Sequence, residues 1–258
     1  MRPLAQFTDA TDLRGVLFDL DDTLLSHGML TREAYDALWA LHDAKLGLIA
    51  VTGRPSGWGE VLVRQWPVLG AVTENGAILT AKDGVRDPVS ASERQSRRVR
   101  LSSIIDRMRE KIPEARLADD VGARRSDVTW DIGERIHLPP DRVRAMRAII
   151  EEAGAHTFAS SVHLHATFDA VDKASGAVRA LRELANEDAT SALSRWAFIG
   201  DSGNDRACFA AFRTTFGVAN VRGHIGSLSV PPQFVASLPM GQGFAEISRA
   251  ILAARSGS

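Results

Sequence analysis

Gly15-Val16-Leu17-Phe18-Asp19-Leu20-Asp21-Asp22-Thr23 is the stretch that decides the fold, an apolar run that ends in three acidic residues. An apolar run without alternation is typical of a parallel strand that is buried on both faces. Further runs of this kind recur along the chain, at 48–51, 71–73, 196–199, 214–218 and 234–236. Segments with helical spacing separate them. This alternation of strand and helix predicts an α/β fold with a Rossmann-like parallel sheet.

The predicted helices of this sheet have recognisable ends. Thr31 can cap a helix whose apolar positions recur at helical spacing, and Gly47 is predicted to end that helix. Later helices are predicted at about 56–65, 172–186 and 242–254, and another begins near Asn204. Asn75-Gly76 indicates a tight turn before a further strand at 77–80.

The character of the chain changes near Arg86. A long helix is predicted at about 92–112 and a second from Pro140 to Gly154, and each is followed by two strand-like segments. Those segments lie at 115–118, 126–132, 155–159 and 162–168. Two helix-strand-strand units predict an antiparallel sheet with both helices on one face. We therefore expect a core formed by residues 1–85 and 169–258, with residues 86–168 as an inserted α+β cap domain.

Composition narrows the function classes. The 258 residues include 31 basic and 32 acidic ones, a net charge of −1, so a nucleic-acid-binding protein is not expected. The first residues hold no apolar run of signal-peptide length, and no stretch reaches the roughly 20 apolar residues of a membrane span. The single cysteine, Cys208, excludes an internal disulfide. We expect a cytoplasmic protein without membrane or nucleic-acid partners, as a monomer or homodimer.

Four polar clusters follow predicted strands or open a helix: Asp19 to Thr23, Thr52-Gly53-Arg54, Lys173, and Gly200 to Asp205. In open α/β sheets, ligands bind at the carboxyl ends of the strands. Grouped carboxylates repel one another unless a cation lies between them, and oxygen ligands without Cys or His favour Mg²⁺. The hydroxyl and strand-end N–H of Thr52 and the ammonium of Lys173 suit phosphate oxygens. A carboxylate nucleophile with Mg²⁺ suits phosphoryl transfer.

Asp19-Leu20-Asp21-Asp22-Thr23 resembles the DxDxT signature of the haloacid dehalogenase (HAD) superfamily. Thr52, Lys173 and Gly200-Asp201-Ser202-x-Asn204-Asp205 match its other three motifs in order, and Asp22 stands where many members have Gly. The resemblance implies that Asp19 attacks phosphorus, that Asp21 is general acid and then base, and that Thr52 and Lys173 hold the phosphoryl oxygens. It also implies a Mg²⁺ site at the residues Asp19, Asp21 (through its backbone carbonyl), Asp201, Asn204 and Asp205, the last two in a supporting role.

Val51-Thr52-Gly53-Arg54-Pro55 and Glu74-Asn75-Gly76-Ala77 resemble the Cof-type branch of this superfamily. That branch includes sucrose-phosphate, trehalose-phosphate and mannosyl-3-phosphoglycerate phosphatases and carries a cap after the third strand. The resemblance implies a small phosphorylated substrate, such as a sugar phosphate. We expect substrate contacts from both domains, at Thr52, Gly53, Arg54 and Asn75 in the core and at Arg125, His163 and His165 in the cap.

The cap residues have plainer interpretations as well. His163 and His165 share a face of one predicted strand, where such a pair often only lines a half-buried sheet. Zinc is not expected there, because no Cys or third His stands nearby. Arg124 and Arg125 precede a cap strand, and either one can clamp an anionic or hydroxylated substrate or lie on the solvated surface.

Three other functions stay open. A phosphomutase shares the fold, and Ser126 to Asp131 and His163 to Lys173 loosely resemble phosphomannomutases, but the Gly-Asp-Ser-Gly-Asn-Asp loop favours a hydrolase. A phospho-accepting receiver also uses Asp, Thr and Lys on a parallel sheet, but its acceptor follows the third strand and it has no cap. A catalytically silent sugar-phosphate sensor is the third, although this chain lacks none of the key residues. The sequence does not identify the substrate.

Overall fold

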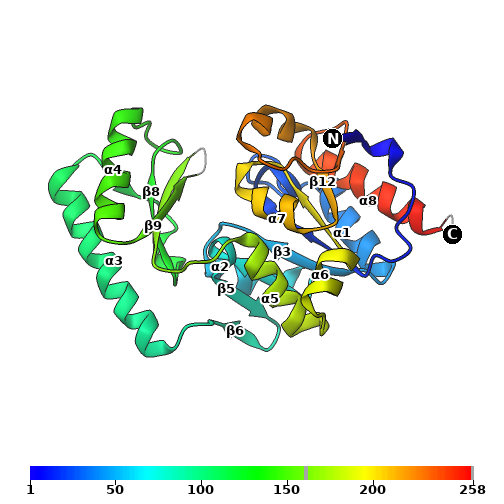
Figure 1. Cartoon of the computed structure of the whole chain (residues 1–258), viewed down its shortest axis with the longest axis horizontal. Helices are drawn as coiled ribbons and strands as arrows, with labels where there is room; N and C mark the ends of the chain where they lie inside the picture. Colours follow the sequence, from blue (N-terminus) through cyan, green and yellow to red (C-terminus); the bar gives the residue numbers. More distant parts are fainter. Residues whose placement is uncertain (160–161, 257–258) are drawn as a thin grey trace.

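The computed structural model of the chain describes residues 1–159 and 162–256, whose strands form a nine-stranded and a four-stranded sheet. Figure 1 shows the two sheets in separate units that lie side by side, with both chain ends in the larger one. We call the larger the core unit and the smaller the cap unit. The predicted α/β class with an α+β insertion is confirmed.

The core sheet is parallel except at one edge. Counted from β1 at one edge, its first seven strands run parallel to their neighbours. The turn at Asn75-Gly76 reverses the chain, so β5 is antiparallel to β4, and a second reversal makes β6 antiparallel to β5. In order across the sheet the strands are β1 (Arg2–Pro3), β13 (Phe234–Val235), β12 (Thr214–Gly217), β11 (Trp196–Gly200), β2 (Gly15–Phe18), β3 (Gly47–Val51), β4 (Gly70–Thr73), β5 (Ile78–Ala81) and β6 (Gly84–Arg86).

Helices cover both faces of this sheet. Along β2, Val16 and Phe18 pack into one apolar cluster, with residues of α1, α2 and α8, while Leu17 packs into the other, with residues of α5, α6 and α7. Side chains alternate across a strand, so a strand buried on both faces has to be apolar throughout. The core helices are α1 (Arg32–Asp43), α2 (Ser56–Gln65), α5 (Lys173–Ala185), α6 (Ala189–Arg195), α7 (Arg206–Ala211) and α8 (Met240–Ser256).

Local signals set several helix ends. The Thr31 hydroxyl accepts the N–H of Ala34, which confirms the predicted cap of α1. The prediction that Gly47 ends this helix is wrong: the helix ends at Asp43, Lys45 takes a left-handed conformation (φ 65°), and Gly47 already begins β3. Short turns of 3₁₀ type, and one of π type at η2, are η1 (Leu4–Gln6), η2 (Leu20–Leu24), η3 (Glu74–Gly76), η4 (Val121–Ala123), η5 (Gly203–Asp205) and η6 (Ala219–Ser227).

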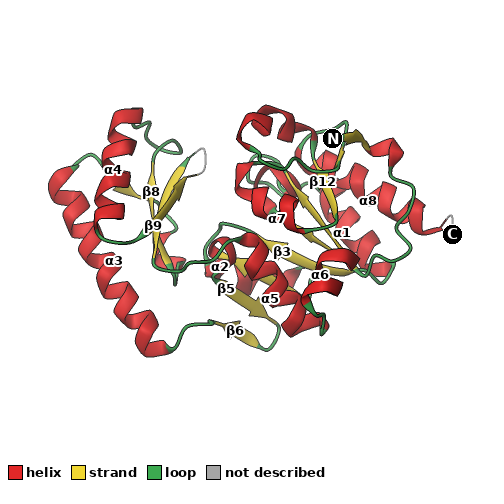
Figure 2. Cartoon of the chain, viewed as in Figure 1, coloured by secondary structure: helices red, strands yellow, loops and turns green. Residues whose placement is uncertain are grey.

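The cap unit is an antiparallel sheet with two helices on one face, as predicted. Its strands lie in the order β7 (Arg116–Leu117), β8 (Asp127–Asp131), β10 (His163–Thr167) and β9 (His156–Ala159). Trp130 and Leu164 pack against α3 (Ala91–Lys111) and α4 (Pro140–Glu152), which lie on the side turned away from the core unit (Figure 2). The domain boundaries at 86 and 168 stay a prediction, and residues 160–161 and 257–258 of the two ranges lie outside the described residues.

The two connections between the units meet at one arginine. Arg94 in the first turn of α3 donates to Asp87, which precedes this helix, at 2.7 Å, and to Asp169, which follows β10, at 2.5 Å. The two crossing points of the chain are therefore tied together. Within residues 1–159 and 162–256, no helix combines the length and the apolarity that a membrane crossing requires.

Candidate active site

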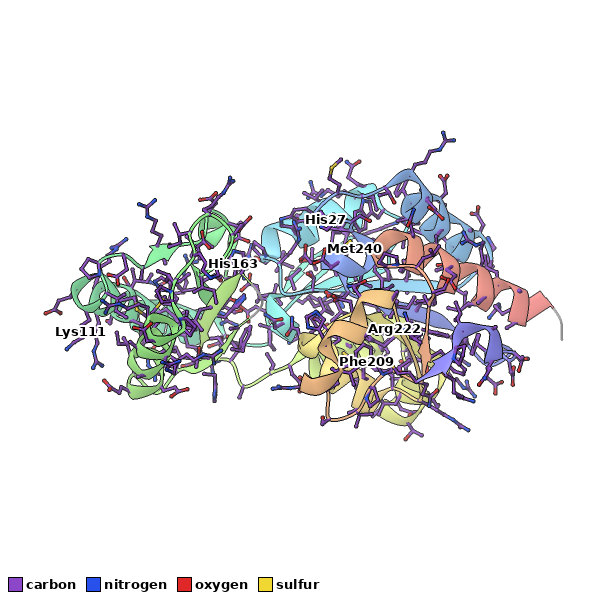
Figure 3. All side chains as sticks on the ribbon, turned by 90° about the horizontal axis from the view of Figure 1, so that it is seen from above. His27, Lys111, His163, Phe209, Arg222 and Met240 are labelled. Carbon is purple, nitrogen blue, oxygen red and sulfur yellow. The ribbon has the colours of Figure 1, made fainter. Side chains whose placement is uncertain are left out.

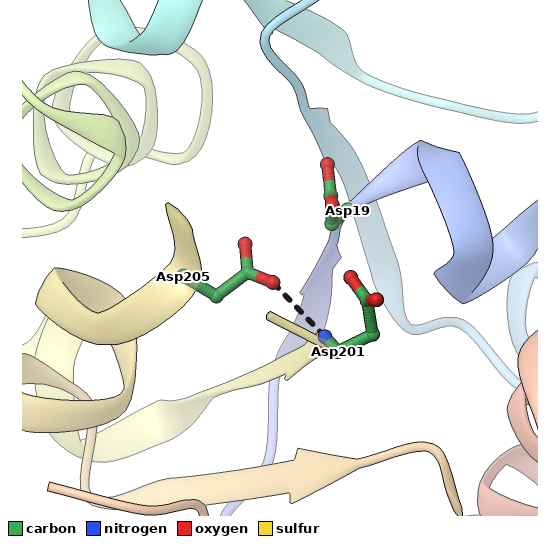
Figure 4. Close-up of side chains that lie close together, drawn as sticks. All are labelled: Asp19, Asp201 and Asp205. Carbon is green, nitrogen blue, oxygen red and sulfur yellow. Dashed lines mark hydrogen bonds between the residues drawn. The ribbon is translucent and has the colours of Figure 1, made fainter. Parts of the chain in front are cut away.

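Three carboxylates converge where β2 and β11 end (Figure 4). Asp19 follows β2, Asp201 follows β11, and Asp205 lies in the turn after it. All three are buried, and one carboxylate oxygen of each lies within 4.8 Å of one oxygen of each of the other two. The backbone N–H of Asp19 donates to the carbonyl of Ile199 at 2.9 Å. The pairing of two strands far apart in the sequence therefore brings these acids together.

Lys173 supplies a positive charge to this group. Its Nζ lies 2.8 Å from an oxygen of Asp19 and 2.8 Å from an oxygen of Asp205, and the residue is 1% exposed. Burial disfavours the charge, but the two carboxylates outweigh it and raise the pKa of the Lys173 ammonium. Gly76 allows α5 to approach this closely, because a Cβ there would lie 2.1 Å from the carbonyl oxygen of Asp172.

The cluster carries more negative than positive charge. Burial raises the pKa of Asp201 to about 7, and the nearby Asp205 adds to the effect. Burial also raises the pKa of Asp19, helped by Asp205 and Asp201 although Lys173 opposes it. A further cation would relieve this repulsion, and a set of carboxylate oxygens fits Mg²⁺.

Hydrogen bonds fix the orientation of Asp205 and Asp201. One oxygen of Asp205 accepts the N–H groups of Asp201 and Ser202, at 2.9 and 3.2 Å. Asp201 accepts the amide of Asn220 at 2.9 Å and the hydroxyl of Thr23 at 3.2 Å. Asn220 was not predicted from the sequence, although it closely follows β12 and lies at the same sheet edge as the other clusters.

The loop after β3 lies beside these acids, and one sequence expectation about it is wrong. The N–H of Thr52 donates to the carbonyl of Val72 at 2.8 Å, so it belongs to the sheet and is not available to a phosphate. The hydroxyl of Thr52 accepts the N–H of Arg54 at 3.1 Å, which leaves the hydroxyl proton to be donated elsewhere.

Asp21 is bound by an arginine. The guanidinium of Arg54 donates to its carboxylate at 2.5 and 3.0 Å and stacks on the ring of Trp58, 3.9 Å from the ring centre. Among the described residues, Asp21 is not in the carboxylate group formed by Asp19, Asp201 and Asp205. The side chain predicted to move protons therefore stands apart from the predicted metal ligands.

Asn75 brings two of the predicted clusters together. Its side-chain oxygen accepts the amide of Asn204 at 2.9 Å, and its backbone N–H donates to the carbonyl of Thr52 at 3.1 Å. Its side-chain nitrogen is buried without a hydrogen-bond partner in the described structure. This donor lies beside Gly53, where an added Cβ would come within 3.2 Å of it. Asn75 thus has a donor for a substrate, whereas a metal-supporting role of Asn204 stays a prediction.

The three predicted cap residues differ in their surroundings. His165 is buried, with Nδ1 2.8 Å from Asp127 and its ring stacked on Phe158, and burial lowers its pKa although Asp127 opposes this. The Nε2 of His163 lies 2.8 Å from Glu134, and Figure 3 shows His163 in the cap unit far from Lys111. Arg125 is exposed. Both histidines therefore already have an acidic partner.

Arg124, for which the sequence allowed a substrate clamp or a place on the solvated surface, is buried and bonded within the protein. Its guanidinium donates to the carbonyl of Gly53 and to both oxygens of Asp127, each at 3.1 Å. Burial would raise the pKa of Asp127, but Arg124 and His165 outweigh it, and the pKa is lowered. A chain of hydrogen bonds thus runs from His165 through Asp127 and Arg124 to the Thr52-Gly53-Arg54 loop.

Comparisons with known proteins agree with the fold described above. The family model of sucrose-6F-phosphate phosphohydrolase matches residues 14–227, while no curated protein matches the sequence. Among solved structures, a Thermoplasma acidophilum protein is 18% identical with a TM-score of 0.73, over 93% of this chain and 99% of its own. The sucrose-phosphatase of Synechocystis sp. PCC6803, in complex with sucrose and phosphate, is 16% identical (TM-score 0.67; 93% and 98%). A HAD-superfamily phosphatase of Bacteroides thetaiotaomicron is 16% identical (TM-score 0.64; 93% and 96%).

Proposed function

This chain belongs to the sucrose-6F-phosphate phosphohydrolase family of HAD-like phosphatases, and we propose that it hydrolyses a sugar phosphate through an aspartyl-phosphate on Asp19. One observation carries the proposal. Buried Lys173 contacts both Asp19 and Asp205 at 2.8 Å, beside Asp201, at the ends of two central strands. The Synechocystis relative, solved with sucrose and phosphate, supports the substrate class.

Mg²⁺ fits as the cofactor, held by the carboxylates of Asp19 and Asp201. Bound there, it supplies positive charge that offsets the charge on the transferring phosphoryl oxygens. Asp205 already accepts hydrogen bonds from Lys173 and from two backbone N–H groups. We assign it the role of fixing Lys173 and the loop that carries Asp201.

The reaction proceeds in two steps. A carboxylate oxygen of Asp19 attacks phosphorus, the ester P–O bond breaks, and Asp21 gives a proton to the departing sugar oxygen. Asp21 then takes a proton from water, whose oxygen attacks phosphorus and releases inorganic phosphate and the Asp19 carboxylate. Arg54, which binds Asp21 in this structure, has to release it first, and the incoming phosphate is a competing anion for this guanidinium.

Phosphate contacts come from the core unit in this proposal. Thr52 donates its hydroxyl proton, and the buried side-chain nitrogen of Asn75 is a further donor next to Gly53. Arg125, His163 and His165 remain our candidates for contacts to the sugar.

Replacing Asp21 by Asn should slow the release of a sugar alkoxide far more than that of p-nitrophenolate. A poor leaving group needs a proton and the phenolate hardly does, and general acid catalysis is worth about 10²- to 10⁴-fold. Single-turnover rates with the two esters give the comparison. Equal losses on both would mean that Asp21 has another role.

Stability should fall with rising pH in the metal-free protein. The folded pKa of Asp201 is raised from 3.8 to about 7, so between these values the folded state binds more protons than the unfolded chain. The free energy of unfolding therefore decreases as pH rises through about 7. A Mg²⁺ concentration of roughly 100 times the Kd at pH 8 should raise the free energy of unfolding by about 2.7 kcal/mol at that pH. The same concentration should raise it by less at about pH 5, where the proton on Asp201 competes with the metal. Thermal melts with and without Mg²⁺ measure this, and equal metal effects at both pH values would argue against the acidic site.

Incubating the Mg²⁺-loaded protein with a panel of sugar phosphates tests the proposed function. We expect stoichiometric release of inorganic phosphate from at least one of them. Isomerisation of a sugar phosphate without phosphate release would instead indicate a phosphomutase. Turnover of none of them would remove the substrate class from the proposal.

A further inference from the structure

The carboxylate of Glu74 joins the two units. Glu74 is 3% exposed and follows β4 in the core unit. Its Oε1 accepts the backbone N–H of Ser56, in the core unit, and of Arg125, next to β8, each at 2.9 Å. Its Oε2 accepts both the N–H and the hydroxyl of Ser126, each at 2.6 Å. Since a carboxylate has about four acceptor positions, Glu74 uses nearly all of its capacity between two units.

Neighbouring hydrogen bonds join the same two segments, 53–56 and 123–126. The hydroxyl of Ser56 donates to the carbonyl of Ala123 at 3.1 Å, and Arg124 donates to the carbonyl of Gly53 at 3.1 Å. These contacts are separate from the chain crossings, which Arg94 ties together through Asp87 and Asp169. The segment around Glu74 is therefore a third attachment of the cap unit to the core unit.

The backbone of this segment is held in an unfavourable conformation. Glu74 and Asn75 both have left-handed φ angles, 50° and 55°. Residues without the freedom of glycine keep such angles only where the surroundings enforce them. Here the N–H of Glu74 donates to the carbonyl of Arg54 at 2.9 Å, and that of Asn75 donates to the carbonyl of Thr52 at 3.1 Å. The segment thus contacts the loop after β3 through its backbone and the cap unit through its carboxylate.

We propose that Glu74 is a positioning residue that fixes the cap unit relative to the Thr52-Gly53-Arg54 loop, and thereby sets the preference for sugar phosphates over small phosphate esters. The inference rests on the proposed function. A leaving group that contacts the cap unit needs a fixed distance between this unit and the bound phosphate. The leaving group of p-nitrophenyl phosphate lacks the sugar hydroxyls that the cap unit would bind.

Glu74→Gln is the informative change. Its amide has one oxygen, so whichever way it turns, either the N–H groups of Ser56 and Arg125 or the N–H and hydroxyl of Ser126 face an NH₂ group. We expect kcat/KM for the preferred sugar phosphate to fall about 10- to 100-fold and that for p-nitrophenyl phosphate to stay within about threefold, because misplacement by about 1 Å can cost about 10²-fold. Ser126→Ala removes a single hydroxyl donor. It should lower kcat/KM for the sugar phosphate relative to that for p-nitrophenyl phosphate, but by less than Glu74→Gln does.

Glu187→Gln is the matched control. Glu187 is also a buried carboxylate, 4% exposed, but it bonds within the core unit, to Arg14 and to the indole N–H of Trp196. The ratio of the two kcat/KM values should not change in this variant. A fall in the ratio equal to that of Glu74→Gln would overturn the proposal, because general loosening of the protein would then explain it.

Hydrogen–deuterium exchange gives a readout that does not depend on any substrate. In Glu74→Gln the amides of Ser56 and Arg125, or that of Ser126, should exchange faster than in the wild type, while those of β2 and β11 keep their rates. If the wild-type protein hydrolyses no sugar phosphate, the proposed function fails, and this exchange still tests the attachment. Unchanged exchange, or faster exchange with an unchanged ratio of kcat/KM values, would overturn the inference.

Discussion

Asp19→Asn is expected to lower kcat by about 10⁴- to 10⁶-fold on every substrate, the scale on which the loss of a central catalytic side chain acts. An amide is too weak a nucleophile to attack phosphorus, so the variant lacks the first step of the reaction. The fold should persist, because Lys173 keeps its contact with Asp205 and the substitution removes one of the mutually repelling charges.

The turnover and the melting temperature of Asp19→Asn are to be measured beside those of the wild type and of Glu187→Gln. In Glu187→Gln a buried carboxylate far from the cluster becomes an amide. A melting temperature near that of the wild type together with lost turnover supports the assignment. Wild-type turnover by the well-folded variant would exclude Asp19 as the nucleophile.

Removal of divalent metal should have the second largest effect. Treatment with EDTA is expected to lower kcat by about 10²- to 10³-fold, the scale of losing one preorganised electrostatic contact to the reacting group. Added Mg²⁺ should restore activity. Ca²⁺ should restore little, because its ligand distances of about 2.3–2.6 Å exceed the roughly 2.0–2.1 Å of Mg²⁺ and misplace the Asp19 carboxylate.

The metal prediction has its own control. Asp201→Asn removes a carboxylate from the cluster that Asp19 and Asp205 share. Its remaining activity should respond much less to EDTA than that of the wild type. Undiminished wild-type activity after complete chelation would contradict the metal site as a whole.

Much of the fold could be predicted because a buried strand or helix face requires apolar residues at a regular spacing in a short stretch of sequence. The β2 strand is fully buried and apolar throughout, and α2 lies at Ser56–Gln65, where its spacing predicted it. Helix α6 was missed because it has only seven residues, of which only Ala192 is buried. Strands β1 and β6, with two and three residues, are too short to show a pattern.

The site could be predicted to the level of the four clusters, because each stands where a buried strand ends or a helix begins. The hydrogen-bond partners of individual side chains and backbone groups could not be predicted, since these partners come from distant segments of the chain. The Thr52 N–H bonds to Val72 in the neighbouring strand, and Glu74 bonds to Ser126, 52 residues away. Asn220 reaches Asp201 across 19 residues. No local pattern records such pairings, which form only when the strands assemble.

The central claim is that phosphate passes through Asp19, and the phosphoenzyme itself tests it most directly. Asp21→Asn should accumulate this species with p-nitrophenyl phosphate, because the phenolate leaves unaided while the attacking water lacks its base. Rapid acid quenching, borohydride reduction and peptide mass spectrometry locate the phosphorylated carboxyl group. We predict one modified residue per molecule, Asp19, converted to homoserine. Release of phosphate with no modification at Asp19, or with the modification at another residue, would contradict the account.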